Sequence, residues 1–398
     1  MGRKRFLTIS LCIGLAIALA AGLAGTAQAA DQAKTLRIGS LKALTGFDSF
    51  LDAPDSSDVK LLASMINEKG GITIKGQRYN IEIVDEDIKS TLEGTTAAAT
   101  KLVFEKKVKF VTGPAGWFAP AASAVFNPNK VMYSIEWSTG QPSELGPYGF
   151  LGGCGSINNA IIALNAAKKE FPNVKKLAIM TADDGSAPYL TAAVKKLLPR
   201  YGFAMVGDVV AYSNELQDMS PIAAKLNGMK DADAIFSMAT APPHFANALK
   251  GLRELGNTKP WIACTIIEPK DLITIAGKMG ATNVTTMANE PGAPGNPPLY
   301  EEIYKRRTGA RQIYPVLGPS SLYALINVIK AADSIDPDAV KAQWEKMSTI
   351  ETVFGKGMNG GDETYGIKHH VLAVPSSYQK AMNGEVAFRG WIEPGPIP

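Results

Sequence analysis

Short apolar runs alternate with amphipathic stretches along most of the chain. The run at 36–41 is typical of a buried strand, and residues 56–69 repeat apolar side chains at helical spacing from Val59 to Ile66. Gly70 then provides a helix stop. The same order continues with a helix at 91–105 and strands at 79–84, 108–112 and 131–135. Strand, helix and strand at this spacing predict right-handed crossovers on a parallel sheet.

The alternation restarts after Gly149, which predicts a second α/β unit. Helical patterns at 157–171 and 187–201 flank an apolar strand at 177–181, and further strands are expected at 206–210, 234–237 and 261–264. Segments rich in Gly and Pro interrupt the pattern at 146–155, 289–298 and 355–361, and helical patterns at 299–308 and 321–335 lie between the last two. Three breaks in a chain of two lobes indicate that the polypeptide passes between the lobes more than once.

The first thirty residues have the order of a secretory signal. Arg3-Lys4-Arg5 precede an uncharged apolar run of 13 residues at 11–23, and Ala27-Gln28-Ala29 places small residues where a signal peptidase cuts. The run is short for a transmembrane anchor, and no basic stop-transfer flank follows it. We therefore expect a signal peptide at 1–29, a mature chain that begins at Ala30, and export to the periplasm.

The amino-acid composition argues against several classes of function. With 46% apolar and 20% charged residues, the 398-residue chain is typical of soluble globular proteins of two or three domains. The 41 basic and 37 acidic residues nearly balance once the three basic residues of the signal are removed, so no basic footprint for nucleic acid remains. Three His and three Cys argue against a His-rich metal site or a disulfide framework. Cys154 and Cys264 are expected to be independent buried thiols, with pairing as the alternative.

Motifs for bond chemistry are incomplete. Gly153 and Gly155 open a predicted helix, but Asn158 takes the third glycine position of the dinucleotide fingerprint. The segment 57–60, with Ser57 and Lys60, fits the SxxK pattern of serine acylases. Segments 212–214 and 307–309 loosely resemble the other two acylase elements. An exposed helix face is the favoured interpretation of 57–60, and an exported serine acylase is the alternative. No cofactor or metal is expected.

Four early segments carry a family likeness. They are IGSLKALTG (38–46), LASMINEKGGI (62–72), DEDIKSTLEGTTAAATKLV (85–103) and VKFVTGP (108–114). In order and spacing they resemble the periplasmic solute-binding proteins of ABC importers, of the leucine/isoleucine/valine-binding type. The resemblance implies two doubly wound parallel-sheet lobes with three crossovers, formed by 30–152 plus 288–368 and by 153–287 plus 369–398. It also implies a monomer that binds a small-molecule ligand, delivers it to a membrane permease and has no enzymatic activity.

The resemblance places the ligand contacts on loops at the carboxyl ends of strands, where open α/β sheets bind ligands. The expected contacts are Gly116, Trp117, Phe118, Glu136, Trp137, Ser138, Ser186, Thr240 and Thr265, with 47–50 at the cleft rim. Amino-acid binders of the family usually carry a run of Ser or Thr where this chain has Gly116-Trp117-Phe118.

The aromatic residues among these contacts leave two interpretations open. Trp117, Phe118 and Trp137 could form a wall for a flat, apolar or cationic ligand, or belong to the core. Glu136 could meet a cationic group or form a structural ion pair. The expected ligand is a branched-chain or other apolar amino acid or an amide derived from one, and the alternative is a small aromatic or apolar carboxylate.

Overall fold

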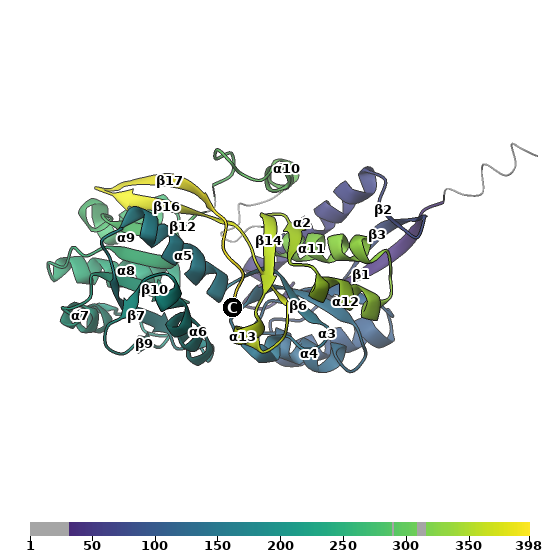
Figure 1. Cartoon of the computed structure of the whole chain (residues 1–398), viewed down its shortest axis with the longest axis horizontal. Helices are drawn as coiled ribbons and strands as arrows, with labels where there is room; N and C mark the ends of the chain where they lie inside the picture. The colour runs from purple at the N-terminus through teal and green to yellow at the C-terminus, as the bar shows by residue number, and fades with distance from the viewer. Residues whose placement is uncertain (1–31, 289, 309–315) are drawn as a thin grey trace, which may run out of the picture.

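Two α/β lobes lie side by side in the computed structural model, which describes residues 32–288, 290–308 and 316–398 (Figure 1). The first lobe is built on a nine-stranded sheet in the order β13-β14-β15-β6-β5-β4-β1-β3-β2. The second holds an eight-stranded sheet in the order β17-β16-β12-β11-β10-β7-β8, with β9 also paired to β7. The α/β class expected from the alternating pattern is therefore confirmed. The expected signal peptide at 1–29 lies outside the described residues.

The centre of the first sheet is parallel. Its strands β1 (Lys34–Lys42), β3 (Gln77–Asp87), β4 (Phe110–Thr112), β5 (Met132–Ser138) and β6 (Gly149–Gly155) run in one direction, and β2 (Ile72–Ile74) is antiparallel to β3. Helices α2 (Ser49–Glu68), α3 (Leu92–Phe104) and α4 (Ala119–Phe126) connect them, and a short 3-10 helix, η1 (Pro142–Glu144), precedes β6. A parallel sheet brings the carboxyl ends of β1, β4 and β5 to one edge, which is where the site lies.

Helix α2 is longer than the sequence pattern predicts. It begins at Ser49, seven residues before the expected start at 56, and it includes Pro54. The apolar side chains of Val59 and Leu62 pack in the core as expected, while the amino-terminal half buries carboxylates. Proline usually marks a helix start or interruption, so the pattern places the beginning of this helix after Pro54 rather than before it.

The second lobe contains α5 (Ser156–Glu170), β7 (Lys176–Ala182), α6 (Ala187–Arg200), β8 (Ala204–Met205), β9 (Val210–Tyr212), α7 (Ser220–Gly228), β10 (Ala234–Met238), α8 (Pro242–Glu254), β11 (Trp261–Ile266), α9 (Pro269–Gly280) and β12 (Val284–Met287). The single strand expected at 206–210 is wrong. Gly207 has a positive φ of 64°, and the chain turns there between β8 and β9.

The chain then returns to the first lobe through α10 (Pro298–Arg306), α11 (Leu317–Ala332), α12 (Pro337–Lys346), β13 (Thr349–Thr352), β14 (Gly355–Gly360), α13 (Asp362–Tyr365) and β15 (Val371–Ala373). Strands β16 (Ser376–Met382) and β17 (Glu385–Ile392) complete the second sheet. Because β15 pairs with β6, the chain leaves the first sheet after Ala373 and not after Lys368.

The carboxyl-terminal tail makes a further connection between the lobes. After β17 it returns to the first lobe, where Gly361 N donates to Ile397 O at 2.7 Å and Thr364 N donates to Pro398 O at 3.0 Å. The tail and β15 therefore associate with the first lobe, although the expected division assigned 369–398 to the second. Within the described ranges, no helix combines the length and apolar character needed to cross a membrane.

Candidate functional site

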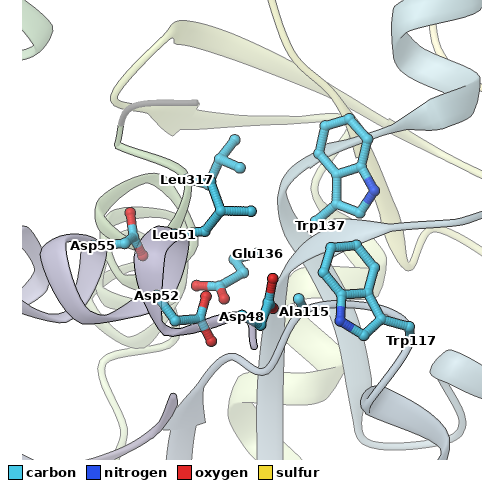
Figure 2. A pocket seen from close by; sticks show the side chains of 9 residues that line it. All are labelled: Asp48, Leu51, Asp52, Asp55, Ala115, Trp117, Glu136, Trp137 and Leu317. Atoms are coloured by element: carbon cyan, nitrogen blue, oxygen red, sulfur yellow. The ribbon is translucent and has the colours of Figure 1, made fainter. Parts of the chain in front are cut away.

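The carboxyl ends of β1, β4 and β5 meet the amino-terminal half of α2 around a cavity of about 190 Å³. Figure 2 shows its wall of two indole rings beside a group of carboxyl side chains. The cavity is lined by Asp48, Leu51, Asp52, Asp55, Ala115, Trp117, Glu136, Trp137 and Leu317. Three of these, Trp117, Glu136 and Trp137, are residues that the sequence predicts for the site.

The two indoles come from neighbouring segments, Trp117 from the loop after β4 and Trp137 from the end of β5. Ala115, three residues beyond β4, pairs with Trp137 as an isolated parallel bridge. Gly116 allows this close approach, because a Cβ at that position would lie 2.8 Å from the Trp137 carbonyl oxygen. The loops are adjacent, as the order of the parallel strands predicts. Trp117 keeps 38% of its surface exposed, so part of its side chain remains available to a small molecule.

A buried lysine lies behind the carboxyl groups. Lys42, at the end of β1, is completely buried, and its Nζ forms ion pairs with Asp55 and Glu136. Gly318 N, in the first turn of α11, donates to both oxygens of Asp55 at 3.1 and 3.2 Å. Asp52 instead accepts from Ala43 N at 2.7 Å. Four carboxyl groups line the cavity: those of Asp48, Asp52, Asp55 and Glu136. Lys42 forms ion pairs with two of them, Asp55 and Glu136.

The environment of these groups shifts their pKa values in a consistent direction. Burial and the nearby charge of Asp52 raise the pKa of Asp48 to about 6, against the opposing effect of a hydrogen bond with Trp117. Burial also raises the pKa of Asp52 and, more strongly, that of Glu136. Burial alone would lower the pKa of Lys42, but the carboxylates around it raise the pKa above its ordinary range. Each raised pKa favours the neutral, protonated form of its carboxyl group, so the cavity is lined by acidic groups whose ionisation is suppressed by burial.

A second cavity, of about 320 Å³, is shared by the two lobes. Trp117, Trp137 and Thr139 line it from the first lobe. The second lobe supplies Ser186 and Thr240 from the loops after β7 and β10, and Thr265 from the end of β11. Both tryptophans therefore line this cavity as well as the acidic one. Six of the nine predicted site residues line one or both cavities.

The three hydroxyl groups from the second lobe are mostly buried. Ser186 N and Oγ both donate to Asp184 Oδ1, at 3.0 and 2.6 Å. Thr240 Oγ1 donates to Met238 O at 2.9 Å. These bonds hold the loops in shape, and the residues contribute to the cavity wall together with Asp184 and Asn214.

The other three predicted contacts, Gly116, Phe118 and Ser138, line neither cavity. Phe118 is 4% exposed, caps the start of α4 and belongs to the core with Ala119 and Ala122. Ser138 is completely buried between Glu144 and the Tyr365 hydroxyl, at 2.6 and 2.5 Å. Both residues were expected to contact the ligand, with core packing as the alternative for Phe118, and neither lines either cavity. Gly116 allows the loop after β4 to lie close to the backbone of Trp137, as described above.

Sequence reasoning expected 47–50 at the cleft rim, where Asp48 lines the cavity, but it missed the rest of the acidic face of α2. Asp48, Asp52, Asp55 and Asp58 recur every three or four residues, which is a helical spacing that could have been noticed. Asp58 points elsewhere and pairs with Arg307. Leu317 also lines the cavity. It lies 180 residues after Trp137, and no motif around it in the sequence indicates this position.

The acylase alternative does not find its residues together. Ser57 is exposed on α2 and its Oγ donates to Ala53 O at 3.3 Å, while Lys60 pairs with Asp85. Tyr212 lies on β9 of the second sheet. A nucleophile needs its base within hydrogen-bond reach, and the described contacts of Ser57 include none.

Cys154 on β6 and Cys264 on β11 are buried free thiols. Cys154 Sγ donates to Asn159 Oδ1 at 3.3 Å, and Asn159 Nδ2 donates to Cys264 O at the same distance. Burial raises the pKa of Cys154 to about 11. Neither thiol is an activated nucleophile in this environment.

The sequence and fold match known proteins. The family model described as periplasmic binding protein matches residues 35–372. Among solved structures, the chain is 20% identical to LivJ of Streptococcus pneumoniae, a branched-chain amino acid transporter substrate binding protein in complex with isoleucine. That match has a TM-score of 0.65 and covers 91% of this chain and 100% of the other.

Two further structures have similar scores. The leucine binding protein LivK of Thermotoga maritima is 21% identical, with a TM-score of 0.65 and coverage of 90% and 99%. A substrate binding protein of an ABC transporter from Aeropyrum pernix is 18% identical, with a TM-score of 0.71 and coverage of 92% and 97%. These likenesses extend over both lobes and concern the fold.

Proposed function

This chain belongs to the periplasmic binding protein family, and we propose that it is the substrate-binding component of an ABC importer of the branched-chain amino acid type. It binds one small organic solute between its lobes, as a monomer, and delivers it to a membrane permease without changing any bond. The proposal includes export by the segment 1–29 and residence in the periplasm.

The observation that carries the proposal is the cavity shared by the two lobes. Its walls are loops at the carboxyl ends of parallel strands in both sheets, and open α/β sheets bind ligands at such ends. Three chain connections and the returning tail join the two lobes, and a small number of connections of this kind permits hinge closure. Trp117 and Trp137 extend the wall into the acidic cavity of the first lobe.

The site residues we propose for the ligand are Trp117, Glu136, Trp137, Ser186, Thr240 and Thr265. Isoleucine is the ligand of the LivJ complex, so an apolar amino acid, or an amide derived from one, is the first class to test. The two indole rings also suit a small aromatic or apolar carboxylate, the second class.

A thermal-shift screen of the mature chain tests the proposal. Amino acids, amides, aromatic acids and amines are compared at equal concentrations. A specific ligand at a hundredfold excess over its Kd stabilises the folded state by about 2.7 kcal/mol. Quenching of tryptophan fluorescence gives a second readout, because both indoles line the cleft. A chain that binds no small solute in either assay is not a solute-binding component.

A further inference from the structure

The charge of the cavity walls restricts the class of ligand. Four carboxyl side chains line the cavity of the first lobe, and Asp184 adds a fifth in the shared cavity. No Lys, Arg or His is among the described residues that line either cavity. A ligand with a net negative charge would meet repulsion on both sides and find no cationic side chain to bind.

Lys42 does not supply the missing cation. Its side chain is completely buried, it does not line either cavity, and its Nζ is engaged by Asp55 and Glu136. Gly318 closes its remaining side, since even a Cβ there would lie 2.7 Å from Nζ. Lys42 therefore stabilises the carboxyl cluster from behind and leaves the cavity surface acidic.

Two carboxylate oxygens in the cluster are buried without a hydrogen bond. Glu136 and Asp48 are each 3% exposed, and Glu136 Oε1 and Asp48 Oδ2 have no hydrogen-bond partner among the described residues. Both side chains line the cavity. An unpaired buried carboxylate oxygen is costly, and a donor in the cavity would remove that cost.

The two indoles provide the complementary surface for a cation. Figure 2 shows the rings of Trp117 and Trp137 on one side of the cavity and the carboxyl groups of Asp48, Asp52 and Glu136 converging beside them. Tryptophan is the best aromatic partner of organic cations, whose charge is attracted to the ring face. A cavity of about 190 Å³ accommodates a small ligand only.

We infer that the ligand is a small organic cation, with its charged group between Asp48, Asp52 and Glu136 and its apolar body against Trp117 and Trp137. The inference rests on the proposed function and specifies its substrate class. It favours an amine or guanidine without a carboxylate over the amino acids and carboxylates considered above.

Matched pairs of probes test the sign of the charge. Choline is compared with 3,3-dimethylbutan-1-ol, which has the same shape without charge, and butylguanidinium with butylurea. Leucine, benzoate and calcium chloride complete the set. Calorimetric titration of the mature chain measures each Kd. We expect at least one cation to bind at least tenfold more tightly than its neutral partner, which corresponds to ~1.4 kcal/mol.

Two substitutions connect that preference to the site. Glu136→Gln and Asp48→Asn should each weaken binding of the preferred cation at least tenfold and leave the neutral partner unchanged. Asp48→Asn keeps the Lys42 ion pairs intact, so it remains informative if Glu136→Gln fails to fold. Glu82→Gln is the matched control, because Glu82 is exposed on β3 and lines neither cavity. It should bind the cation as the unmodified chain does.

The outcomes separate this inference from the proposed function. If leucine, benzoate or a neutral partner binds at least as tightly as the cations, the cation inference is wrong while the solute-binding function stands. If calcium binds and displaces the cation probes, the carboxyls form a metal site and the inference is also wrong. If none of the probes and no solute of the wider screen binds, both proposals fail.

Discussion

Gly318 N donates to both carboxylate oxygens of Asp55, at 3.1 and 3.2 Å. The contact joins the start of α11 to the middle of α2, across 263 residues of sequence. A Cβ at Gly318 would overlap the Asp55 carboxylate and crowd Lys42. The absence of a side chain at this position therefore permits the ion pair that supports the cavity from behind.

Gly318→Ala should consequently destabilise the fold. Overpacking of a buried site typically costs about 1–3 kcal/mol, and here the displaced groups are charged. Urea unfolding at constant pH measures the free energy of unfolding. The control is Gly228→Ala at the end of α7, where an added Cβ meets no atom within 4 Å. Equal stability of the two variants would show that the close packing at Gly318 contributes nothing.

The sequence predicts the loops of the site better than the face opposite them. The aromatic wall could be predicted because Trp117 follows β4 and Trp137 lies near the end of β5, and strands that are consecutive along the chain are usually neighbours. The helical spacing of the four aspartates indicates a shared face, but not its burial, because aspartates near a helix start normally mark a solvated surface. Their burial depends on Lys42 and Glu136, which are 94 residues apart.

Ser138 illustrates the same limit. A hydroxyl at the end of a strand is a reasonable ligand contact, but the expected strand ended at 135, whereas β5 continues to Ser138. Whether it faces the cavity depends on Tyr365, whose hydroxyl lies 2.5 Å from Ser138 Oγ although the residues are 227 positions apart.

The chain turn after β8 had a local cause, which is the positive φ of Gly207. The apolar residues around Gly207 led instead to the prediction of one continuous strand.

Ser57→Ala should leave ligand affinity and thermal stability unchanged. Ser57 is exposed and makes one long hydrogen bond to the carbonyl of the preceding helical turn, which contributes little to stability. The unmodified chain should also remain free of a covalent adduct after incubation with a reactive β-lactam. Intact-mass spectrometry is the measurement, and an adduct on Ser57 would restore the acylase alternative.

Asp48 makes the stability of the unliganded chain depend on pH. Its pKa in the fold is about 6, above the ordinary value of 3.8. The folded state therefore binds more protons than the unfolded state between these values. The stabilisation from this group is complete below pH 3.8 and is lost as the pH rises through about 6.

Asp48→Asn should remove this dependence, since the amide does not ionise. Relative to the unmodified chain, the variant should gain stability between pH 4.5 and pH 7.5, by roughly 1–3 °C in Tm. Calorimetric melting curves of both proteins at the two pH values provide the comparison. Burial also raises the pKa of Asp58 to about 6. Because Asp58 is present in both proteins, its contribution to the pH dependence cancels in the comparison. A Tm difference that is constant with pH would contradict the assignment to Asp48.

The two tryptophans should determine affinity more than folding. Both line the acidic cavity and the shared cavity, so each ring is positioned to contact a ligand held between the lobes. Loss of a ring that packs on a bound molecule costs about 2–4 kcal/mol, because truncation removes packing as well as the ring face. We expect Trp117→Ala and Trp137→Ala each to weaken binding of the ligand at least tenfold, or ~1.4 kcal/mol.

Melting curves distinguish this effect from unfolding. Trp117 is 38% exposed, and its removal should leave Tm close to that of the unmodified chain, whereas Trp137 packs partly against the core and should lower it. Phe104→Ala is the matched control, because Phe104 is 59% exposed at the end of α3 and lines neither cavity. Retained affinity in both tryptophan variants would contradict the aromatic wall. Loss of affinity that only accompanies unfolding would assign the rings to the core, because a contact with ligand must weaken binding in a chain that is still folded.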